Sequence, residues 1–357
     1  MRAAVLREIG RPLEVLDLEV EAPRAGEVRV RMTASGVCHS DVHRADGDWG
    51  PIPGALVLGH EGAGVIEALG PGVTDRAVGQ QVALSWNASC GTCDACRRGE
   101  EWLCVDTKAL DCLLPDGTTR LATRDGEPIR QYIGIGTFAE AAVVPVSAAI
   151  PVGPVAPEVA ALIGCCVATG VGAVRNAARV APGERVVVFG LGGVGLSTVM
   201  GAALAGASEI VAVDLDPAKL EVAREVGATR AVLAGDFAPD ASLDVALEAA
   251  GSARTAELAL ASVRPGGRVV LVGMPHRDAR VTFSPLSVVE TSVTIVGTNY
   301  GWTLPARDFP FLAEQVLAGR LPVERLVDRR IGLDDVNAAM DELRAGRGLR
   351  RVIAFPG

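Results

Sequence analysis

The sequence predicts an α/β fold in which a β-rich first part precedes a doubly wound parallel sheet. The run 26–34 (GEVRVRMTA) alternates apolar and charged residues, as a half-buried strand does. From about Pro157 onward, short apolar runs typical of strands alternate with Ala-rich stretches typical of helices. The length of 357 residues is enough for two domains of ordinary size.

The two parts differ in the elements that we expect. Strand-like pieces at 64–68 and 81–84, separated by Gly/Pro turns, continue the β-rich part to about Pro151. The second part is expected to contain strands at 185–189, 209–213, 243–248 and 267–272, with helices at 194–207 and 217–226. Two amphipathic helices, at 309–318 and 334–344, are expected to close the chain.

The composition argues against several classes of protein. A formal net charge of −9 leaves no positive field for nucleic acid. The start lacks an uninterrupted apolar segment, and later apolar runs are broken by Pro, Gly or charge, so we expect neither export nor a membrane span. Eight cysteines in such a chain favour metal ligation over disulfides. We therefore expect a globular, cytoplasmic protein.

A glycine-rich turn, GLGGVG, joins the predicted strand 185–189 to the next helix and covers Gly190, Gly192, Gly193, Val194 and Gly195. Glycines here let the backbone approach a pyrophosphate, and the helix N-terminus supplies N–H groups. Asp214 ends the next strand, where its carboxylate can accept hydrogen bonds from ribose hydroxyls and repels a 2′-phosphate. The predicted cofactor is NAD; the alternative is a strand-helix turn that binds no nucleotide.

Four cysteines share one short loop in the pattern C-x2-C-x2-C-x7-C, at Cys90, Cys93, Cys96 and Cys104. Four thiolates at this spacing can surround one Zn²⁺ and leave no open position, so the site is expected to be structural. Disulfides or unpaired thiols are the alternatives. Cys38, His60, Glu61 and Cys165 are scattered, and each taken alone reads equally well as an ordinary core or surface residue.

The runs GVCHSD (36–41), GHEGAG (59–64), GCCVATG (164–170) and GLGGVG occur with the four-cysteine loop in one order along nearly the whole chain. In this order the chain resembles the zinc-containing medium-chain alcohol dehydrogenases. An extended insertion at 105–132 makes it most similar to the long-loop branch, which holds the class III and mycothiol-dependent formaldehyde dehydrogenases. The resemblance implies a GroES-like β-barrel catalytic domain at 1–166, a Rossmann nucleotide domain at 167–297, and a return to the catalytic domain at 298–357.

The resemblance also implies a second zinc, held by Cys38, His60 and Cys165 with a fourth position left open for a substrate oxygen. Asp41 matches the carboxylate that orients the zinc-binding histidine. Glu61 matches a glutamate near the metal that exchanges with its ligands. Two zinc ions per chain are therefore expected.

For proton release, Ser40 and His43 match the family's relay, in which the serine takes the substrate proton and passes it through the nicotinamide ribose to the histidine. Without the resemblance, both would be read as surface residues. His39 and Arg350 match basic positions near the pyrophosphate, and Lys219 matches a lysine near the adenosine ribose.

The chain departs from the family pattern at several points. Cys166 replaces a glycine, although Cys165 is the cysteine in register with the motif, and Cys112 has no assigned partner. The segment 228–243 is about ten residues shorter than usual, which predicts a deleted or trimmed crossover helix. Three aromatic residues are expected to line either the substrate pocket or the core: Trp49, Trp86 and Tyr132.

The leading hypothesis is an NAD-dependent zinc enzyme that moves a hydride between an alcohol, or its aldehyde in reverse, and the cofactor. The alternative within the same branch is oxidation of a thiol adduct of formaldehyde, of the S-hydroxymethyl mycothiol type. The Cys38, His60 and Cys165 set argues against a zinc-free reductase, and a non-catalytic zinc protein is the remaining class. Long-loop relatives lead us to expect a homodimer, without nucleic acid or membrane partners.

Overall fold

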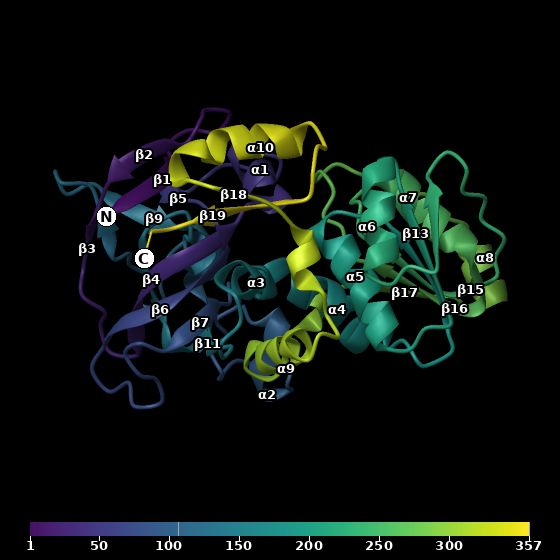
Figure 1. Cartoon of the computed structure of the whole chain (residues 1–357), viewed down its shortest axis with the longest axis horizontal. Helices are drawn as coiled ribbons and strands as arrows, with labels where there is room; N and C mark the ends of the chain where they lie inside the picture. Colours follow the sequence, from purple (N-terminus) through teal and green to yellow (C-terminus); the bar gives the residue numbers. More distant parts are fainter. Residues whose placement is uncertain (106, 357) are drawn as a thin grey trace. The chain divides into compact units, whose positions relative to one another are not determined.

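The computed structural model describes residues 1–105 and 107–356 of the chain (Figure 1). Two compact units divide these residues. The first unit comprises Met1–Cys165, Leu304–Leu317 and Val327–Gly357, and the second comprises Cys166–Thr303 and Ala318–Leu326. The chain therefore leaves the first unit and returns to it twice.

The first unit is built on two sheets. One sheet has the strand order β2-β1-β5-β9-β8-β3, and the other has the order β11-β7-β6-β4-β19-β18, with β10 also paired to β4. The strands are β1 (Arg2–Leu6), β2 (Glu14–Asp17), β3 (Glu19–Val20), β4 (Glu27–Gly36), β5 (Leu56–Val57), β6 (Glu61–Leu69), β7 (Gln81–Leu84), β8 (Leu121–Ala122), β9 (Pro128–Gln131), β10 (Ala141–Pro145), β11 (Ala149–Pro151), β18 (Val327–Ile331) and β19 (Arg350–Ala354).

Helices cover these sheets. Figure 1 shows α10 lying along α1, and the two helices are in contact. Apolar residues of α10, including Val336, Met340 and Leu343, enter the same buried cluster as Val30 of β4 and Ile66 of β6. The helices of this unit are α1 (His39–Asp46), α2 (Asp94–Arg97), α3 (Pro157–Leu162), α9 (Pro305–Leu317) and α10 (Val336–Arg344).

The second unit contains one sheet in which every strand pairing is parallel. Its strand order is β14-β13-β12-β15-β16-β17, so the order reverses at β12 as in a doubly wound nucleotide-binding fold. The predicted α/β class is confirmed. The strands are β12 (Arg185–Phe189), β13 (Glu209–Asp214), β14 (Arg230–Leu233), β15 (Leu243–Glu248), β16 (Val263–Leu271) and β17 (Thr294–Gly297).

The helices of the second unit connect these strands, but one connection lacks a helix. Helices α5 and α6 pack on β13, and α7 packs on β15 and β16. Between β14 and β15 the described chain forms no helix, which confirms the predicted loss of a crossover helix from 228–243. The helices are α4 (Ala168–Gly172), α5 (Gly193–Leu204), α6 (Pro217–Glu225), α7 (Ala253–Ser262) and α8 (Pro285–Thr291).

The helical run Pro157–Ala178 is long and apolar enough to cross a membrane, which the sequence analysis did not expect. Its length of 22 residues and mean hydropathy of 1.7 are those of a possible membrane span, although we expected every apolar run to be interrupted. The run contains Glu158 and several glycines, but too few charges to lower its hydropathy. In the structure, 83% of its most apolar 18-residue window is buried inside the protein. Packing in the core therefore explains why the run is so apolar.

Predicted and observed bounds differ mainly near the C-terminus. The helix expected at 309–318 begins at Pro305, because proline fits the first turn of a helix and the Asp308 carboxylate accepts a hydrogen bond from the Leu304 N–H at 2.9 Å. The helix expected at 334–344 begins at Val336, since a tight turn at Leu333–Asp335 precedes it. The strand expected at 267–272 is longer and begins at Val263.

Candidate active site

Three separate segments of the first unit meet at one buried cluster. Cys38 follows β4 and stands at the N-cap of α1, while Glu61 opens β6 directly after His60. Because Gly36 of β4 pairs with Glu61 of β6, these residues are neighbours. The third segment arrives through α3, which packs on β4 and β6 and leads into the π-helical turn Ile163–Val167 that carries Cys165. π-Helical turns are frequent at functional sites.

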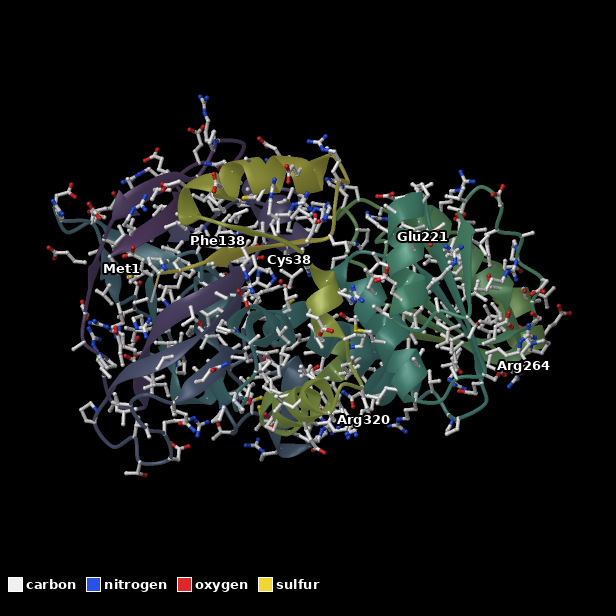
Figure 2. All side chains as sticks on the ribbon, viewed as in Figure 1. Met1, Cys38, Phe138, Glu221, Arg264 and Arg320 are labelled. Atoms are coloured by element: carbon white, nitrogen blue, oxygen red, sulfur yellow. The ribbon has the colours of Figure 1, made fainter. Side chains whose placement is uncertain are left out.

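The side chains of Cys38, His60, Glu61 and Cys165 converge in a common volume. One ligand atom from each lies within 4.8 Å of the others, and all four residues are buried. Figure 2 shows Cys38 among the packed side chains of this unit. Gly36 makes room for the cluster, because a Cβ there would come within 2.2 Å of Glu61 Oε2. Two thiols, an imidazole and a carboxylate are a donor set that suits Zn²⁺.

Asp41 holds the imidazole of this cluster in one orientation. Its carboxylate accepts hydrogen bonds from the backbone N–H of Cys38 at 3.0 Å and of Gly59 at 3.1 Å, and it lies 3.1 Å from His60 Nδ1. Asp41 is fully buried. Since an ionised carboxylate only accepts, Nδ1 carries the proton and Nε2 is the nitrogen available to a metal.

Burial and contacts within the cluster shift the pKa values of Cys38, His60 and Glu61. Hydrogen bonding to Cys165 lowers the pKa of the Cys38 thiol well below its usual range despite burial, and Arg350 lowers it further. Burial disfavours a protonated His60, but Asp41 and Cys38 outweigh this effect and raise its pKa. Burial raises the pKa of Glu61 to about 7, against the opposing charge of Arg350. The protein alone therefore already favours a Cys38 thiolate.

Arg350 joins this cluster, which sequence reasoning did not anticipate. Its guanidinium donates to Glu61 Oε1 at 2.8 Å, to the Val37 carbonyl at 3.0 Å and to Cys38 Sγ at 3.6 Å. The predicted contact of Arg350 with a pyrophosphate stays a prediction. Within the described chain, Glu61 Oε2 is buried without a hydrogen-bond partner. An orphaned carboxylate oxygen beside thiols fits a cation at this position.

The predicted relay residues lie on α1. Ser40 Oγ is 3.7 Å from Cys38 Sγ, so the hydroxyl lies at the edge of the buried cluster. His43 is one turn further along, and its Nδ1 lies 2.6 Å from Asp48 Oδ2. The ring of His39 lies 5.7 Å from the ring of His43, measured between centroids. The Asp48 contact had no signal in the sequence, because a lone aspartate after a helix is usually a turn residue.

The four-cysteine loop forms a second cluster. Sulfur-sulfur distances are 3.5 Å for Cys93–Cys96, 3.9 Å for Cys90–Cys96 and 4.0 Å for Cys93–Cys104. Zinc-sulfur bonds of about 2.3 Å in a tetrahedron place sulfur atoms roughly 3.8 Å apart. These distances therefore fit a zinc ion, and all eight cysteines of the chain are free of disulfides.

Backbone N–H groups support thiolates in this loop. Hydrogen bonds from Thr92, together with the N–H of Cys93, lower the pKa of the Cys90 thiol to about 6. A backbone hydrogen bond from Cys96 lowers the pKa of Cys93. Burial raises the pKa of Cys96 to about 12. A metal ion would have to displace the proton from Cys96.

The glycine turn of the second unit has the form expected of a phosphate cradle. Gly190 has a φ of +85°, and a Cβ at Gly195 would come within 1.7 Å of the Gly190 carbonyl oxygen. At Gly192, the N-cap of α5, a Cβ would meet nothing within 4 Å, and no side chain caps the helix. This open N-terminus, which includes Gly193 and Val194, fits an anionic group.

Asp214 stands at the end of β13 beside this turn. Its Oδ2 accepts from the Leu191 N–H at 2.6 Å, and its Oδ1 accepts from the Asp216 N–H at 2.9 Å. A carboxylate has further acceptor capacity, so a ribose contact is compatible with both bonds. Lys219 lies in the first turn of α6 and is half-buried.

Of the other residues singled out in the sequence, Tyr132 lies against the buried cluster, whereas Trp86 lies on the hydrophobic core. The ring of Tyr132 is buried and meets the ring of His60 edge-on at 5.6 Å. Trp86 packs against the core of the first unit. Cys166 is fully buried outside the four-residue ligand group, which contains its neighbour Cys165.

Comparisons with known proteins bear on both units. Residues 24–155 match the family described as alcohol dehydrogenase GroES-like domain, and residues 193–316 match the zinc-binding dehydrogenase family. S-(hydroxymethyl)glutathione dehydrogenase of Escherichia coli O1:K1 / APEC is 37% identical over 370 residues, with 99% of each chain covered.

Solved structures are similar over the same length. Benzyl alcohol dehydrogenase from Acinetobacter calcoaceticus has a TM-score of 0.93 at 31% identity, covering 99% of both chains. Acetophenone reductase from Geotrichum candidum, solved in complex with NAD, has a TM-score of 0.82 at 26% identity, covering 99% of this chain and 97% of its own. The predicted GroES-like and Rossmann-type architecture is thereby confirmed.

Proposed function

The chain belongs to the zinc-dependent alcohol dehydrogenase family, and on that premise we propose that it interconverts a small primary alcohol and its aldehyde with NAD. The observation that carries this proposal is the convergence of Cys38, His60 and Cys165 from three distant segments into one buried site. Membership makes the protein an oxidoreductase. The residue roles below are our proposal.

In this proposal Cys38, His60 and Cys165 hold the catalytic zinc, with Glu61 beside it, and Cys90, Cys93, Cys96 and Cys104 hold the structural zinc. A bound catalytic zinc supplies Lewis acidity that makes an alcohol easier to deprotonate. Asp41 fixes the tautomer of His60, so that Nε2 points to the metal. Arg350 balances Glu61 and the Cys38 thiolate.

The proton of the alcohol is proposed to leave by way of α1. The Ser40 hydroxyl takes the proton at Oγ while it gives up its own, and the His43 imidazole releases a proton to water. Positions i and i+3 share one helix face, which supports this pairing. An imidazole is suited to such release because its unperturbed pKa lies near neutrality.

The second unit is proposed to bind NAD rather than NADP. The open N-terminus of α5 at Gly192 can receive the pyrophosphate, and Gly190 and Gly195 allow the turn itself. Asp214 can accept from the ribose hydroxyls and repels a 2′-phosphate. His39, Lys219 and Arg350 are proposed as basic contacts of the cofactor.

A thiol adduct of formaldehyde is the second candidate substrate. The observation that favours it is the 37% identity to an S-(hydroxymethyl)glutathione dehydrogenase, whereas the benzyl alcohol dehydrogenase structure favours a free alcohol. Neither relative favours mycothiol over another thiol. The test is NAD reduction with a panel of alcohols, and with formaldehyde in the presence and absence of thiol. NADH formation from formaldehyde with added thiol, and from none of the alcohols, would reject the free-alcohol proposal.

We also propose a cytoplasmic homodimer, with no nucleic acid or membrane partner. None of the eight cysteines forms a disulfide, which suits a reducing compartment. Strand β17 is an edge strand, and α8, which precedes it in the chain, buries none of its residues, with Leu286 64% and Val289 75% exposed. An unpaired sheet edge together with an exposed apolar helix is a natural self-association surface. Light scattering of wild type and Val289→Glu tests it, because a dimer is expected to become a monomer.

A further inference from the structure

The imidazole of His43 is held by a carboxylate that lies outside both metal clusters. Its Nδ1 lies 2.6 Å from Asp48 Oδ2, and the two side chains are 23% and 32% exposed. The ring of Trp49 is tilted by 32° against the imidazole, with centroids 5.1 Å apart. The histidine is therefore fixed through one nitrogen and one ring face, while the pair stays near solvent.

The backbone directs Asp48 toward this ring. Helix α1 ends at Gly47, whose φ is +84°, and the N–H groups of Gly47 and Asp48 both donate to the His43 carbonyl at 3.1 Å. This turn folds Asp48 back over the last helical turn. A Cβ at Gly47 would also come within 2.7 Å of Ile9 Cγ2, so the position requires glycine.

A second anchor holds the loop without involving the imidazole. The Arg44 guanidinium donates to the Pro51 carbonyl at 3.0 Å and to the Gly50 carbonyl at 3.5 Å. Asp48 lies between these bonds and the helix end. The chain is therefore held on both sides of Asp48, by the backbone bond to the His43 carbonyl and by the Arg44 guanidinium.

The charge of Asp48 does not help the helix. A negative charge after a helix C-terminus opposes the helix dipole, so stabilisation of α1 does not account for it. Asp46, two residues earlier, is instead paired with Arg344 of α10 at 2.6 Å. Two acids thus stand at the same helix end, and Asp48 is the one whose carboxylate contacts the imidazole of His43.

The pair has a defined chemical consequence. An ionised carboxylate accepts hydrogen bonds and cannot donate them, so His43 Nδ1 carries a proton. Nε2 of the neutral ring then has a free lone pair. When Nε2 accepts a proton, Asp48 balances the imidazolium; when that proton passes to water, the ring returns to the same tautomer.

We propose that Asp48 is a positioning residue that keeps His43 in the Nδ1–H tautomer, with Nε2 ready to accept the proton released by alcohol oxidation. This inference rests on the proposed role of His43 as the residue that gives the proton to water. It assigns Asp48 a task in the reaction that is additional to the metal clusters and the nucleotide turn.

The kinetic test compares Asp48→Asn with Asp46→Asn. Each variant removes one charge at the end of α1, but only the first disturbs the imidazole. We expect Asp48→Asn to lower kcat/KM for the alcohol about tenfold with little change in the KM for NAD. Asp46→Asn is expected to stay within about twofold of wild type. Added imidazole is expected to restore much of the rate to Asp48→Asn.

Two further variants connect the effect to His43. His43→Gln is expected to lose about as much activity as Asp48→Asn, and the double variant is expected to lose no more than His43→Gln alone. Asp48→Glu, which keeps a carboxylate, is expected to recover part of the loss. Independent, additive losses in the double variant would overturn the proposal.

Nitrogen-15 NMR gives a readout that does not depend on turnover. The chain has four histidines, so the His43 signals can be assigned from their loss in His43→Gln. Neutral His43 is expected as the Nδ1–H tautomer in wild type and in Asp46→Asn, and as a mixture or the Nε2–H tautomer in Asp48→Asn. An unchanged tautomer in Asp48→Asn, or activity equal to that of Asp46→Asn, would overturn the proposal.

A different pair of results would show that the proposed relay through His43 is wrong while the positioning role of Asp48 is right. If Asp48→Asn changes the tautomer while His43→Gln keeps full activity, Asp48 positions His43 but the histidine carries no proton in the reaction. That pair of results would reject the relay in the proposed function, and with it the catalytic part of this inference.

Discussion

The four-cysteine loop takes its candidate metal ligands from residues 90–104, whereas the candidate ligands of the buried cluster lie between residues 38 and 165. The loop ligands are all sulfur, supported by nearby backbone N–H groups, and a tetrahedral ion there would have no open position. The buried cluster has mixed ligands, an orphaned Glu61 oxygen and a guanidinium against its thiolate. This difference is why we propose a structural role for the local cluster and a catalytic role for the assembled one.

The largest expected effect separates Cys165 from its neighbour. Cys165→Ser is expected to lower turnover at least about 10³-fold and to reduce zinc from two ions per chain to one, because a thiolate ligand is lost. Cys166→Ala changes a fully buried residue outside the ligand group and is expected to keep both ions. Metal analysis with turnover measures both. If Cys166→Ala lost a zinc ion and Cys165→Ser did not, Cys166 would replace Cys165 as the proposed ligand.

Arg350 tests the charge balance of the buried cluster. Arg350→Gln is expected to lower the free energy of unfolding by about 3–5 kcal/mol. The substitution removes the guanidinium that pairs with the buried carboxylate of Glu61. Urea unfolding measures this.

The matched control is Arg351→Gln. Arg351 pairs with Glu342, which is 26% exposed and also bonds Arg329, so its loss is expected to cost less. Equal losses of stability in the two variants would contradict the special role of the Arg350–Glu61 pair.

The four-cysteine loop is expected to govern stability rather than chemistry. Cys104→Ser is expected to lose one zinc and to lower Tm by roughly 5 °C, while turnover at low temperature changes little. Cys112→Ala, a buried cysteine outside both clusters, should keep both ions. A drop in turnover as large as that of Cys165→Ser would remove the distinction between the two sites.

Much of the fold, and one of the two candidate metal sites, could be predicted from the sequence. The glycine turn, the four cysteines and the βα alternation are contiguous signals set by local geometry, so residues near one another in the chain suffice to read them. Cys38, His60 and Cys165 are distant in sequence and were found only through resemblance. The resemblance named Arg350 only as a cofactor contact, and neither route predicted its bond to Glu61 or the bond of Asp48 to His43. These contacts depend on β19 lying beside β4 and on the turn after α1.

The smallest expected effect concerns thiol reactivity in metal-free protein. Hydrogen bonds from Thr92 lower the pKa of Cys90 to about 6, whereas burial raises that of Cys96 to about 12. The thiolate is the nucleophile, so Cys90 should be alkylated at pH 7, with a rate that falls as pH drops through 6. Mass spectrometry after iodoacetamide treatment measures each site. Preferential alkylation of Cys96 at pH 7 would contradict this order.

Stepwise removal of zinc by a chelator, with zinc content and NAD-dependent turnover followed on the same samples, tests the central claim most directly. An open catalytic site and a closed structural site predict two ions per chain. The first ion lost should take nearly all activity with it, while the second should leave later and destabilise the fold. Full turnover after the first ion has gone, or one ion per chain at the start, would contradict the account.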